Sequence, residues 1–452
     1  MDYIILTVGS DGDVFPMVSL GRGLKARGHR VILVAAPVYS DAASQSGVDF
    51  VSLSTSESCG DSLRDKPLLA TRYAALFHER YSVPWNAIAY EVIRERASDD
   101  LVVISVNRPN MWADLLARAH FSVPVIRVQL DLPYLGSPKG HVELLLGTDV
   151  QRRLAVRVES AWRNAMAASG IPGRKLSLER LTRSVGCTAT AIALWPQWVL
   201  GEDIDQYMFP TFGFIPQPEN AVAPDVSMNG LSGQKLVVFV AGTSGTTRMW
   251  AQRFFDTSAR ICAHLGCVGV FLGGVAADGC TAASDWIIRR PFLPLSAVLG
   301  RASAIVHHGG IGTAAAAIRH GVPQVVIPRV FGQAGNAEWL RRLGVCAVLD
   351  PKGYTAAQGA AVLREVLTDS RYRRASQQYA LRCDPEADLR RVCEYLDAPD
   401  LLQRLRSVAP REAAQRAWYR RASGHLRRSS AGVGLSVFRQ QAAPAEGHPP
   451  DK

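Results

Sequence analysis

The sequence lacks the patterns that mark a zinc protein, a secreted protein or a membrane-spanning protein. Its 452 residues contain eight cysteines, but no Cys-x-x-Cys pair and no group of Cys and His with the spacing of a zinc site. No apolar run approaches the ~18 residues that a spanning helix needs, and no basic segment precedes an apolar one at the N-terminus. We therefore expect no metal, mostly buried reduced thiols and a cytoplasmic location.

An even spread of positive charge is also missing. The formal net charge is +11, yet residues 399–452 hold ten Lys and Arg against four Asp and Glu, a net +6. The other 398 residues carry only +5, so the body of the chain gives no support for a nucleic-acid partner. We predict that this basic tail begins as an amphipathic helix, is partly disordered, and makes at most a weak peripheral contact with a membrane.

Short β-branched apolar runs alternate with amphipathic segments in two separate sets. Strands are expected at 4–8, 31–36, 101–106 and 125–129, and again at 236–240, 268–272, 304–306 and 324–327. Helices are expected near 14–24, 250–265, 312–320 and 336–343. The fold class is therefore α/β, with two doubly wound Rossmann-like domains that face each other across a cleft. We divide the chain into domains at 1–215 and 235–398, a linker at 216–234 and the tail at 399–452.

The strongest chemical signal is the run His307-His308-Gly309-Gly310-Ile311-Gly312-Thr313, where a strand ends and a helix begins. Glycines let the backbone approach a ligand closely, and the helix N-terminus presents N–H groups with partial positive charge. The run favours a phosphate or diphosphate site, to which either His307 or His308 adds a donor and Thr313 adds a hydroxyl. The alternatives are a tight turn that needs glycine, or a dinucleotide fingerprint, Gly310-x-Gly312-x-x-Ala315. The fingerprint would indicate an NADP-dependent oxidoreductase, with Arg329 near the cofactor.

Polar residues follow other strands at the same edges of the expected sheets. Gln333 and Asn336 carry amides that can hydrogen-bond sugar hydroxyls or phosphate, although Asn336 is equally suited to cap a helix. Thr243 lies in a hydroxylated turn that either contacts phosphate or is only a turn. Asp13 either caps the first helix or is a general base at the mouth of the cleft.

Together these residues resemble the nucleotide-sugar glycosyltransferases of the GT-B fold, family 1. The opening Gly9-Ser10-x-Gly12-Asp13-Val14-x-Pro16 and the later His307-x-Gly-Gly-x-Gly, Gln333 and Asn336-Ala337 match the two signatures of the family in order and separation. The resemblance covers about residues 2–397. Within the family, the chain looks closest to the rhamnosyltransferase chain of rhamnolipid synthesis and to the antibiotic glycosyltransferases that use dTDP-deoxysugars.

The resemblance implies an inverting hexosyltransferase. Its N-terminal domain would bind a lipophilic hydroxylated acceptor, such as a hydroxy fatty acid ester or a natural-product aglycone, and its C-terminal domain a nucleotide-diphosphate sugar. Asp13 would be the catalytic base. The donor would be bound by Thr243, His307, Gly309, Gly310, Gly312, Thr313, Gln333 and Asn336. No metal or other cofactor is expected, because the glycine loop and the helix N-terminus would stabilise the leaving diphosphate.

Two positions depart from the family pattern. Uridine-specific members often carry Glu, which binds both ribose hydroxyls, where this chain has Ala315, and this favours a dTDP-sugar. The Asp-Gln pair that holds the sugar hydroxyls in the family reads Gly332-Gln333 here, which favours a 6-deoxysugar such as L-rhamnose. The alternatives are a UDP-sugar-dependent glucosyltransferase of the same family and a non-enzymatic partner subunit.

The departure at Ala315 generates the first prediction. We expect dTDP to raise the melting temperature of the protein more than UDP, GDP or NADPH does. A nucleotide at ~100 times its Kd adds about 2.7 kcal/mol to the free energy of unfolding, which a thermal-shift assay resolves. Protection by UDP without protection by dTDP would overturn the argument from Ala315, and protection by NADPH alone would favour the oxidoreductase.

Overall fold

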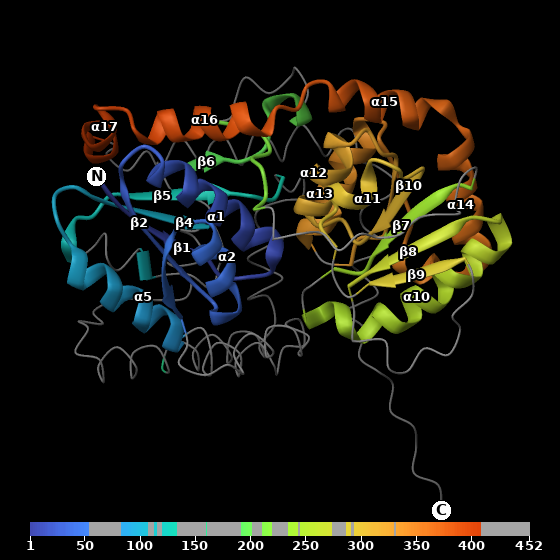
Figure 1. Cartoon of the computed structure of the whole chain (residues 1–452), viewed down its shortest axis with the longest axis horizontal. Coiled ribbons are helices and arrows are strands. Elements are labelled where there is room, and N and C mark those ends of the chain that lie inside the picture. Colours follow the sequence, from blue (N-terminus) through green and yellow to red (C-terminus); the bar gives the residue numbers. More distant parts are fainter. Residues whose placement is uncertain are drawn as a thin grey trace, which may run out of the picture.

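Two parallel sheets form the framework of the molecule, and they lie side by side with helices around them (Figure 1). The computed structural model describes residues 1–53, 83–106, 113–114, 120–132, 160, 191–200, 210–218, 234–242, 245–273, 286–290, 293–329 and 331–407. In these residues the first sheet has the strand order β3-β2-β1-β4-β5-β6, and the second has the order β12-β11-β10-β7-β8-β9. Both orders describe the same doubly wound topology, so the expected α/β class with two Rossmann-like domains is confirmed.

Most strands of the N-terminal sheet are short runs that are buried on both faces, as their β-branched sequence predicts. Its strands are β1 (Asp2–Leu6), β2 (Arg30–Ala35), β3 (Asp49–Ser52), β4 (Leu101–Val106), β5 (Val125–Gln129) and β6 (Ala191–Ala193). Its helical segments are α1 (Asp11–Lys25), η1 (Pro37–Tyr39), α2 (Ser40–Gln45), α5 (Val83–Arg96) and η3 (Gln197–Leu200).

The C-terminal sheet repeats the pattern. Its strands are β7 (Leu236–Val240), β8 (Val268–Leu272), β9 (Ile287–Arg290), β10 (Ala304–His307), β11 (Gln324–Val326) and β12 (Cys346–Val348). The helical segments that accompany it are α10 (Gly245–Leu265), α11 (Ser296–Leu299), α12 (Ile311–Arg319), α13 (Phe331–Arg342), η4 (Pro351–Gly353), α14 (Ala356–Thr368) and α15 (Ser370–Ala380). Helix α13 begins five residues earlier than the sequence pattern predicts.

The strand order fixes where a ligand can bind. In the first sheet β1 pairs with both β2 and β4, and in the second β10 pairs with both β11 and β7. The direction of winding therefore reverses beside β1 and beside β10, and ligands of doubly wound sheets bind at the carboxyl ends of strands at such points. The loops that lead from β1 into α1 and from β10 into α12 are thus the places to search for a site.

The last two described helices return to the N-terminal half, which the expected division at residue 398 did not foresee. Helix α16 (Pro385–Leu396) lies along the N-terminal domain together with α17 (Leu401–Ser407) (Figure 1). Leu396 and Leu401 are fully buried in the same apolar core as α1 and β1. The chain therefore crosses between the halves twice, and the first residues of the expected tail form an ordered, packed helix.

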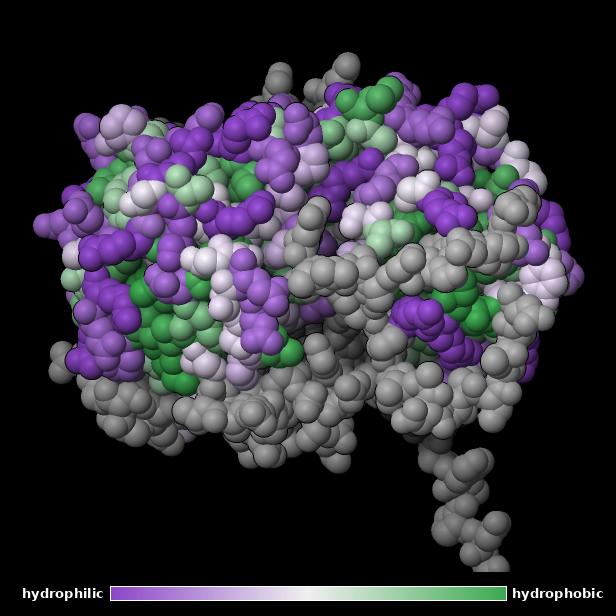
Figure 2. All heavy atoms as spheres, in the orientation of Figure 1, coloured by the Kyte–Doolittle hydropathy of each residue, from purple (hydrophilic) through white to green (hydrophobic). Residues whose placement is uncertain are grey.

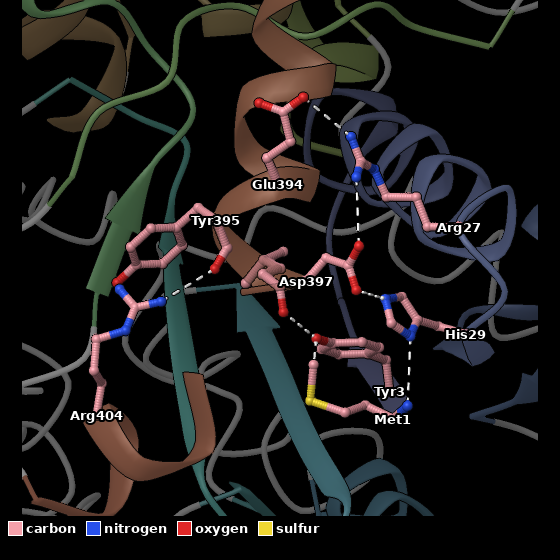
Figure 3. A network of polar contacts seen from close by, with 9 residues as sticks. Met1, Tyr3, Arg27, His29, Glu394, Tyr395, Asp397 and Arg404 are labelled. Atoms are coloured by element: carbon pink, nitrogen blue, oxygen red, sulfur yellow. Dashed lines mark hydrogen bonds and ion pairs between the residues drawn. The ribbon is translucent and has the colours of Figure 1, made fainter. Parts of the chain in front are cut away.

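Polar contacts hold the end of α16 against β1 and the start of β2 (Figure 3). The buried hydroxyl of Tyr3 donates a hydrogen bond of 2.5 Å to the carbonyl oxygen of Leu396. Asp397 lies between two side chains of the N-terminal domain, with Oδ1 2.8 Å from His29 Nε2 and Oδ2 3.4 Å from an Arg27 guanidinium nitrogen. The helix end is thus tied to the first strand by one buried hydrogen bond and a partly exposed charge cluster.

None of the helices in the described part of the chain is both long and apolar enough to cross a membrane. Most of the surface over α15 and α16 is hydrophilic in Figure 2. Four cysteines expected in apolar stretches, Cys262, Cys267, Cys346 and Cys393, are free and buried, and Cys187 lies outside the described residues.

The Tyr3 contact predicts a measurable loss of stability. Replacement of Tyr3 by Phe leaves the ring packed but removes the donor to the Leu396 carbonyl, so the free energy of unfolding should fall by about 1–2 kcal/mol. Urea denaturation measures this change. Tyr395→Phe is the matched control, because the ring stacked beside Arg404 is retained. Equal losses for the two variants would show that the Tyr3 hydroxyl has no special role.

Candidate functional site

Asp13 is held at the start of α1 by its own loop. Ser10 is the N-cap residue of α1, and the Ser10 backbone N–H and hydroxyl donate hydrogen bonds of 2.9 and 3.3 Å to Asp13 Oδ2. Gly9 has φ +141°, and a Cβ at this position would overlap the Asp13 carboxylate. The carboxylate is therefore fixed in a capping box and is 7% exposed. Asp13 serves the helix in this way, and the role of catalytic base stays a prediction.

The glycine loop prepares the N-terminus of α12. Gly309 has φ +88°, a conformation in which side chains are strained, and Gly310 is the N-cap residue. The first hydrogen bond of the helix joins Ala314 N–H to the Gly310 carbonyl at 3.0 Å. The N–H groups that precede Ala314, including those of Gly312 and Thr313, are the ones that an α-helix cannot satisfy internally. The loop thus has the form expected of an anion site.

The N-termini of α1 and α12 face each other across the junction of the two halves. A Cβ at Gly312 would lie 3.5 Å from Gly12 Cα, and a Cβ at Gly12 would lie 4.0 Å from Gly312 N. Gln217, from the segment that leaves the N-terminal half, lies 3.0 Å from the same Gly312 position through Nε2. The structure therefore brings Gly12, Asp13 and the glycine loop together, as the sequence analysis expected of a shared site.

His307 is engaged inside the C-terminal half, and the expected diphosphate contact of this residue stays a prediction. The residue is fully buried at the end of β10. Its Nε2 lies 2.9 Å from Gln324 Oε1, and its Nδ1 accepts a 3.1 Å hydrogen bond from the Gly309 backbone N–H. Burial and the neighbouring His308 lower the pKa of His307 to about 3. His307 is therefore a neutral residue that orders the glycine loop from below.

His308, the other histidine that the glycine-rich run offers as a donor, occupies the more accessible position. It is only half-buried, and its ring lies beside the backbone of Gly242 and Gly310, with Nε2 2.6 Å from the place of a Cβ on Gly310. Burial lowers the pKa of His308 to about 4. The alternation of side chains along a strand explains the pair, because adjacent residues point to opposite sides. That rule alone does not say which of the two points inward.

Asn336 joins the two halves of the molecule and is not a helix cap. It lies within α13, is fully buried, and accepts a 3.1 Å hydrogen bond from the Leu132 backbone N–H through Oδ1. Its Nδ2 donates to the Gly309 carbonyl at 2.9 Å and lies 3.5 Å from Asp131 Oδ1. The amide of Asn336 positions the glycine loop against the turn that follows β5, and direct donor binding by Asn336 stays a prediction.

Gln333 and Arg329 are also engaged within the C-terminal half. Gln333 Oε1 accepts a 2.9 Å hydrogen bond from the Arg329 backbone N–H, and its side chain is partly exposed. The guanidinium of Arg329 lies over the Trp250 ring at 4.7 Å. Arg329 is thus stacked on an aromatic side chain, which gives no support to a cofactor phosphate contact. Thr243 lies outside the described residues.

The described residues contain no group of three or more His, Cys, Asp and Glu side chains able to hold a metal ion. The arrangement instead offers backbone N–H groups at two helix N-termini, one carboxylate beside them and a half-buried histidine. Backbone donors of this kind stabilise developing negative charge. Sequence reasoning missed two residues of the junction, Asp131 and Leu132. The only available signal for these two was their place at the carboxyl end of a strand.

Two protein-family profiles match separate parts of the chain. Residues 3–103 match the glycosyltransferase family 28 N-terminal domain, and residues 278–388 match the C-terminal domain described as erythromycin biosynthesis protein CIII-like. The first match contains β1, α1 and Asp13. The second contains β10, the glycine loop and α13, so each profile covers one side of the junction.

Whole-chain comparisons agree with these matches. The O-mycaminosyltylonolide 6-deoxyallosyltransferase of Streptomyces fradiae is 26% identical over 408 residues, which cover 82% of this chain and 90% of that protein. Among solved structures, the glycosyltransferase of kitacinnamycin superposes with a TM-score of 0.69 at 21% identity, covering 89% of this chain and 98% of the other. The spinosyn rhamnosyltransferase SpnG complexed with thymidine diphosphate gives a TM-score of 0.59 at 17% identity, covering 87% and 100%.

The fold and the site therefore define a glycosyltransferase of the GT-B fold, and the expected hexosyltransferase class is confirmed. More particularly, the chain matches the family 28 N-terminal profile and the EryCIII-like C-terminal profile, and it is similar to antibiotic deoxysugar glycosyltransferases. The oxidoreductase alternative is overturned by these matches. The finer likeness to the rhamnosyltransferase chain of rhamnolipid synthesis stays a prediction.

The adjacent histidines His307 and His308 predict a pH dependence of stability. Unfolding releases both side chains to a pKa near 6.5, so between about pH 6.5 and pH 4 the unfolded state binds more protons than the folded state. The free energy of unfolding should therefore fall with decreasing pH, by about 1.4 kcal/mol per pH unit for each histidine. His307→Gln should reduce this slope over the range of about pH 6 to pH 4.5, in which the unfolded state takes up its protons. His264→Gln, at an exposed site, is the control, and an unchanged slope in His307→Gln would contradict the assignment.

Proposed function

We propose that this protein is an inverting glycosyltransferase that transfers a deoxysugar from a dTDP-sugar to a hydroxyl of a lipophilic natural-product acceptor. The observation that carries the proposal is the facing pair of helix N-termini, with Asp13 beside the glycine loop of the other half. A carboxylate on one side and an anion-binding loop on the other are what a single displacement requires. Neither half holds both parts.

In the proposed reaction, Asp13 accepts the proton of the acceptor hydroxyl. The hydroxyl oxygen forms a bond to the anomeric carbon while the bond from that carbon to the diphosphate oxygen breaks, with inversion. The electron pair leaves with the diphosphate, whose charge is stabilised by the N–H groups at the start of α12. We assign to His308, instead of His307, the additional contact with the diphosphate.

The proposed nucleotide is dTDP. Ala315 lies on the second turn of α12 and is 6% exposed, so its methyl group offers no acceptor for a ribose hydroxyl. Deoxyribose lacks the 2′-hydroxyl, so a dTDP-sugar loses fewer hydrogen bonds than a UDP-sugar when residue 315 has no carboxylate. The thymidine diphosphate bound to the spinosyn rhamnosyltransferase and the deoxysugar in the name of the Streptomyces fradiae relative support the same choice.

For the sugar, a deoxyhexose is proposed, with L-rhamnose as the expectation from Gly332. For the acceptor, the names of the relatives support a natural-product aglycone more than a hydroxy fatty acid ester. A weak contact of the basic tail with an anionic membrane stays a prediction, because residues 408–452 lie outside the described residues.

The test of the proposed chemistry is the replacement of Asp13 by Asn. Asparagine keeps an oxygen that can accept the Ser10 hydrogen bonds, but it does not take a proton, so kcat should fall by about 10²- to 10⁴-fold. Mass detection of the glycosylated product from a panel of dTDP- and UDP-sugars measures kcat. The increase in melting temperature produced by dTDP should stay the same, because the nucleotide lies on the other half.

Asp11→Asn is the matched control, since Asp11 shares the first turn of α1 and its Oδ1 accepts a 3.0 Å hydrogen bond from Tyr39. Its kcat should stay near that of the native protein. Full turnover by Asp13→Asn would remove Asp13 as the base. Absence of transfer by the native protein with every donor would favour the non-enzymatic subunit.

A further inference from the structure

The first turn of α13 carries no side chain at residue 332, and a carboxylate from the other half fills that space. A Cβ built on Gly332 would lie 3.2 Å from Asp131 Oδ2 and 3.4 Å from Asp131 Cγ. The former distance is tighter than most contacts that a real Cβ makes, so a larger residue at 332 would have to displace Asp131. Asp131 follows β5 and therefore belongs to the N-terminal half.

Asp131 is also coupled to the glycine loop. The buried Asn336 amide donates to the Gly309 carbonyl at 2.9 Å and lies 3.5 Å from Asp131 Oδ1. The next backbone N–H along the turn, that of Leu132, donates to the same amide at 3.1 Å. The carboxylate is thus placed, through one buried side chain, at a fixed distance from the start of α12.

The location has the chemistry needed to recognise a sugar. An ionised carboxylate only accepts hydrogen bonds, and the hydroxyls of a hexose are donors that match it. Asp131 is partly exposed, and the amide of Gln333 follows Gly332 in the same turn of α13. A sugar joined to a diphosphate at the α12 N-terminus would extend toward this turn, because Asn336 packs the turn and the glycine loop together.

We infer that Asp131 is the sugar-binding carboxylate of this protein, supplied by the N-terminal half in place of a residue at position 332. This inference rests on the proposed glycosyl transfer. Donor recognition is then divided: the C-terminal half holds the diphosphate, and the N-terminal half accepts the hydroxyls. The substrate class that follows is a hexose or 6-deoxyhexose that retains at least one ring hydroxyl facing Asp131.

The test compares Asp131→Ala with native protein on dTDP-L-rhamnose and on analogues that each lack one ring hydroxyl. With dTDP-L-rhamnose, kcat/KM should fall by about 10- to 100-fold, as expected for a lost hydrogen bond to a charged group. With the analogue that lacks the contacted hydroxyl, the native protein and the variant should differ by less than about 3-fold. A carboxylate that only stabilises α13 would instead produce the same loss with every analogue.

A second variant moves the carboxylate. Asp131→Ala/Gly332→Asp places it on α13, and most of the lost kcat/KM should return, whereas Gly332→Asp alone crowds two carboxylates and should lower activity. Asp131→Asn, which keeps an acceptor for Asn336, is the folding control and should melt within a few degrees of the native protein.

The outcomes separate the two proposals. If the native protein neither binds dTDP nor consumes any nucleotide sugar, the proposed function fails. If the native protein turns over dTDP-L-rhamnose or another dTDP-sugar and Asp131→Ala retains full kcat/KM, only the assignment of Asp131 is overturned. The assignment is also overturned if Asp131→Ala loses the same kcat/KM with every sugar analogue and the double variant does not recover it.

Discussion

A single buried amide determines how the two halves of this protein meet. Asn336 is fully buried, and an amide in that environment must find partners for its donors and its acceptor. It finds them in both halves at once, on the Leu132 backbone N–H, on the Gly309 carbonyl and toward the Asp131 carboxylate. Separation of the halves would break the hydrogen bonds of the amide to Leu132 and Asp131. The amide therefore favours one arrangement of the glycine loop and the turn that follows β5.

That arrangement is possible only because glycines at the junction let the two backbones approach each other closely. Gly12 and Gly312 bring the first turns of α1 and α12 within van der Waals contact of a single added methyl group. Larger residues would hold the two helix N-termini apart and weaken the shared positive potential that each first turn contributes. Gly332 has a similar role on α13, where the absence of a side chain makes room for the Asp131 carboxylate of the other domain. Small residues here are a condition of a site that is built from two domains.

The sheets could be predicted from the sequence because buried parallel strands are short, β-branched and almost continuously apolar. The expected strands at 101–106, 125–129, 236–240 and 268–272 agree with β4, β5, β7 and β8. The partly exposed β3 and the short β6 and β12 carry too little of that signal. For the site, the sequence predicts where the glycine loop and Asp13 lie, because glycines at the carboxyl end of a strand mark a tight turn into a helix.

The individual roles depended on contacts that local patterns do not contain. His307 and His308 are adjacent, and only packing shows that His307 turns toward Gln324. The sequence pattern makes Asn336 a candidate helix cap because it places the start of α13 five residues too late. Asp131 is 201 residues from Gly332 in the sequence, so only the folded structure shows that the two residues are neighbours.

The second crossing of the chain between the halves adds another connection between them. Helix α16 returns from the C-terminal half and is fixed to β1 by the buried Tyr3 hydrogen bond, while the junction itself is held by the Asn336 amide. Because Gly12 and Gly312 leave no space for a phosphate between them, a diphosphate has to reach the first turn of α12 from its open side or with the halves parted. Parting the halves breaks the Asn336 bonds to Leu132 and Asp131 but not the docking of α16. The docking of α16 and the Asn336 amide therefore hold the two halves together at two separate places.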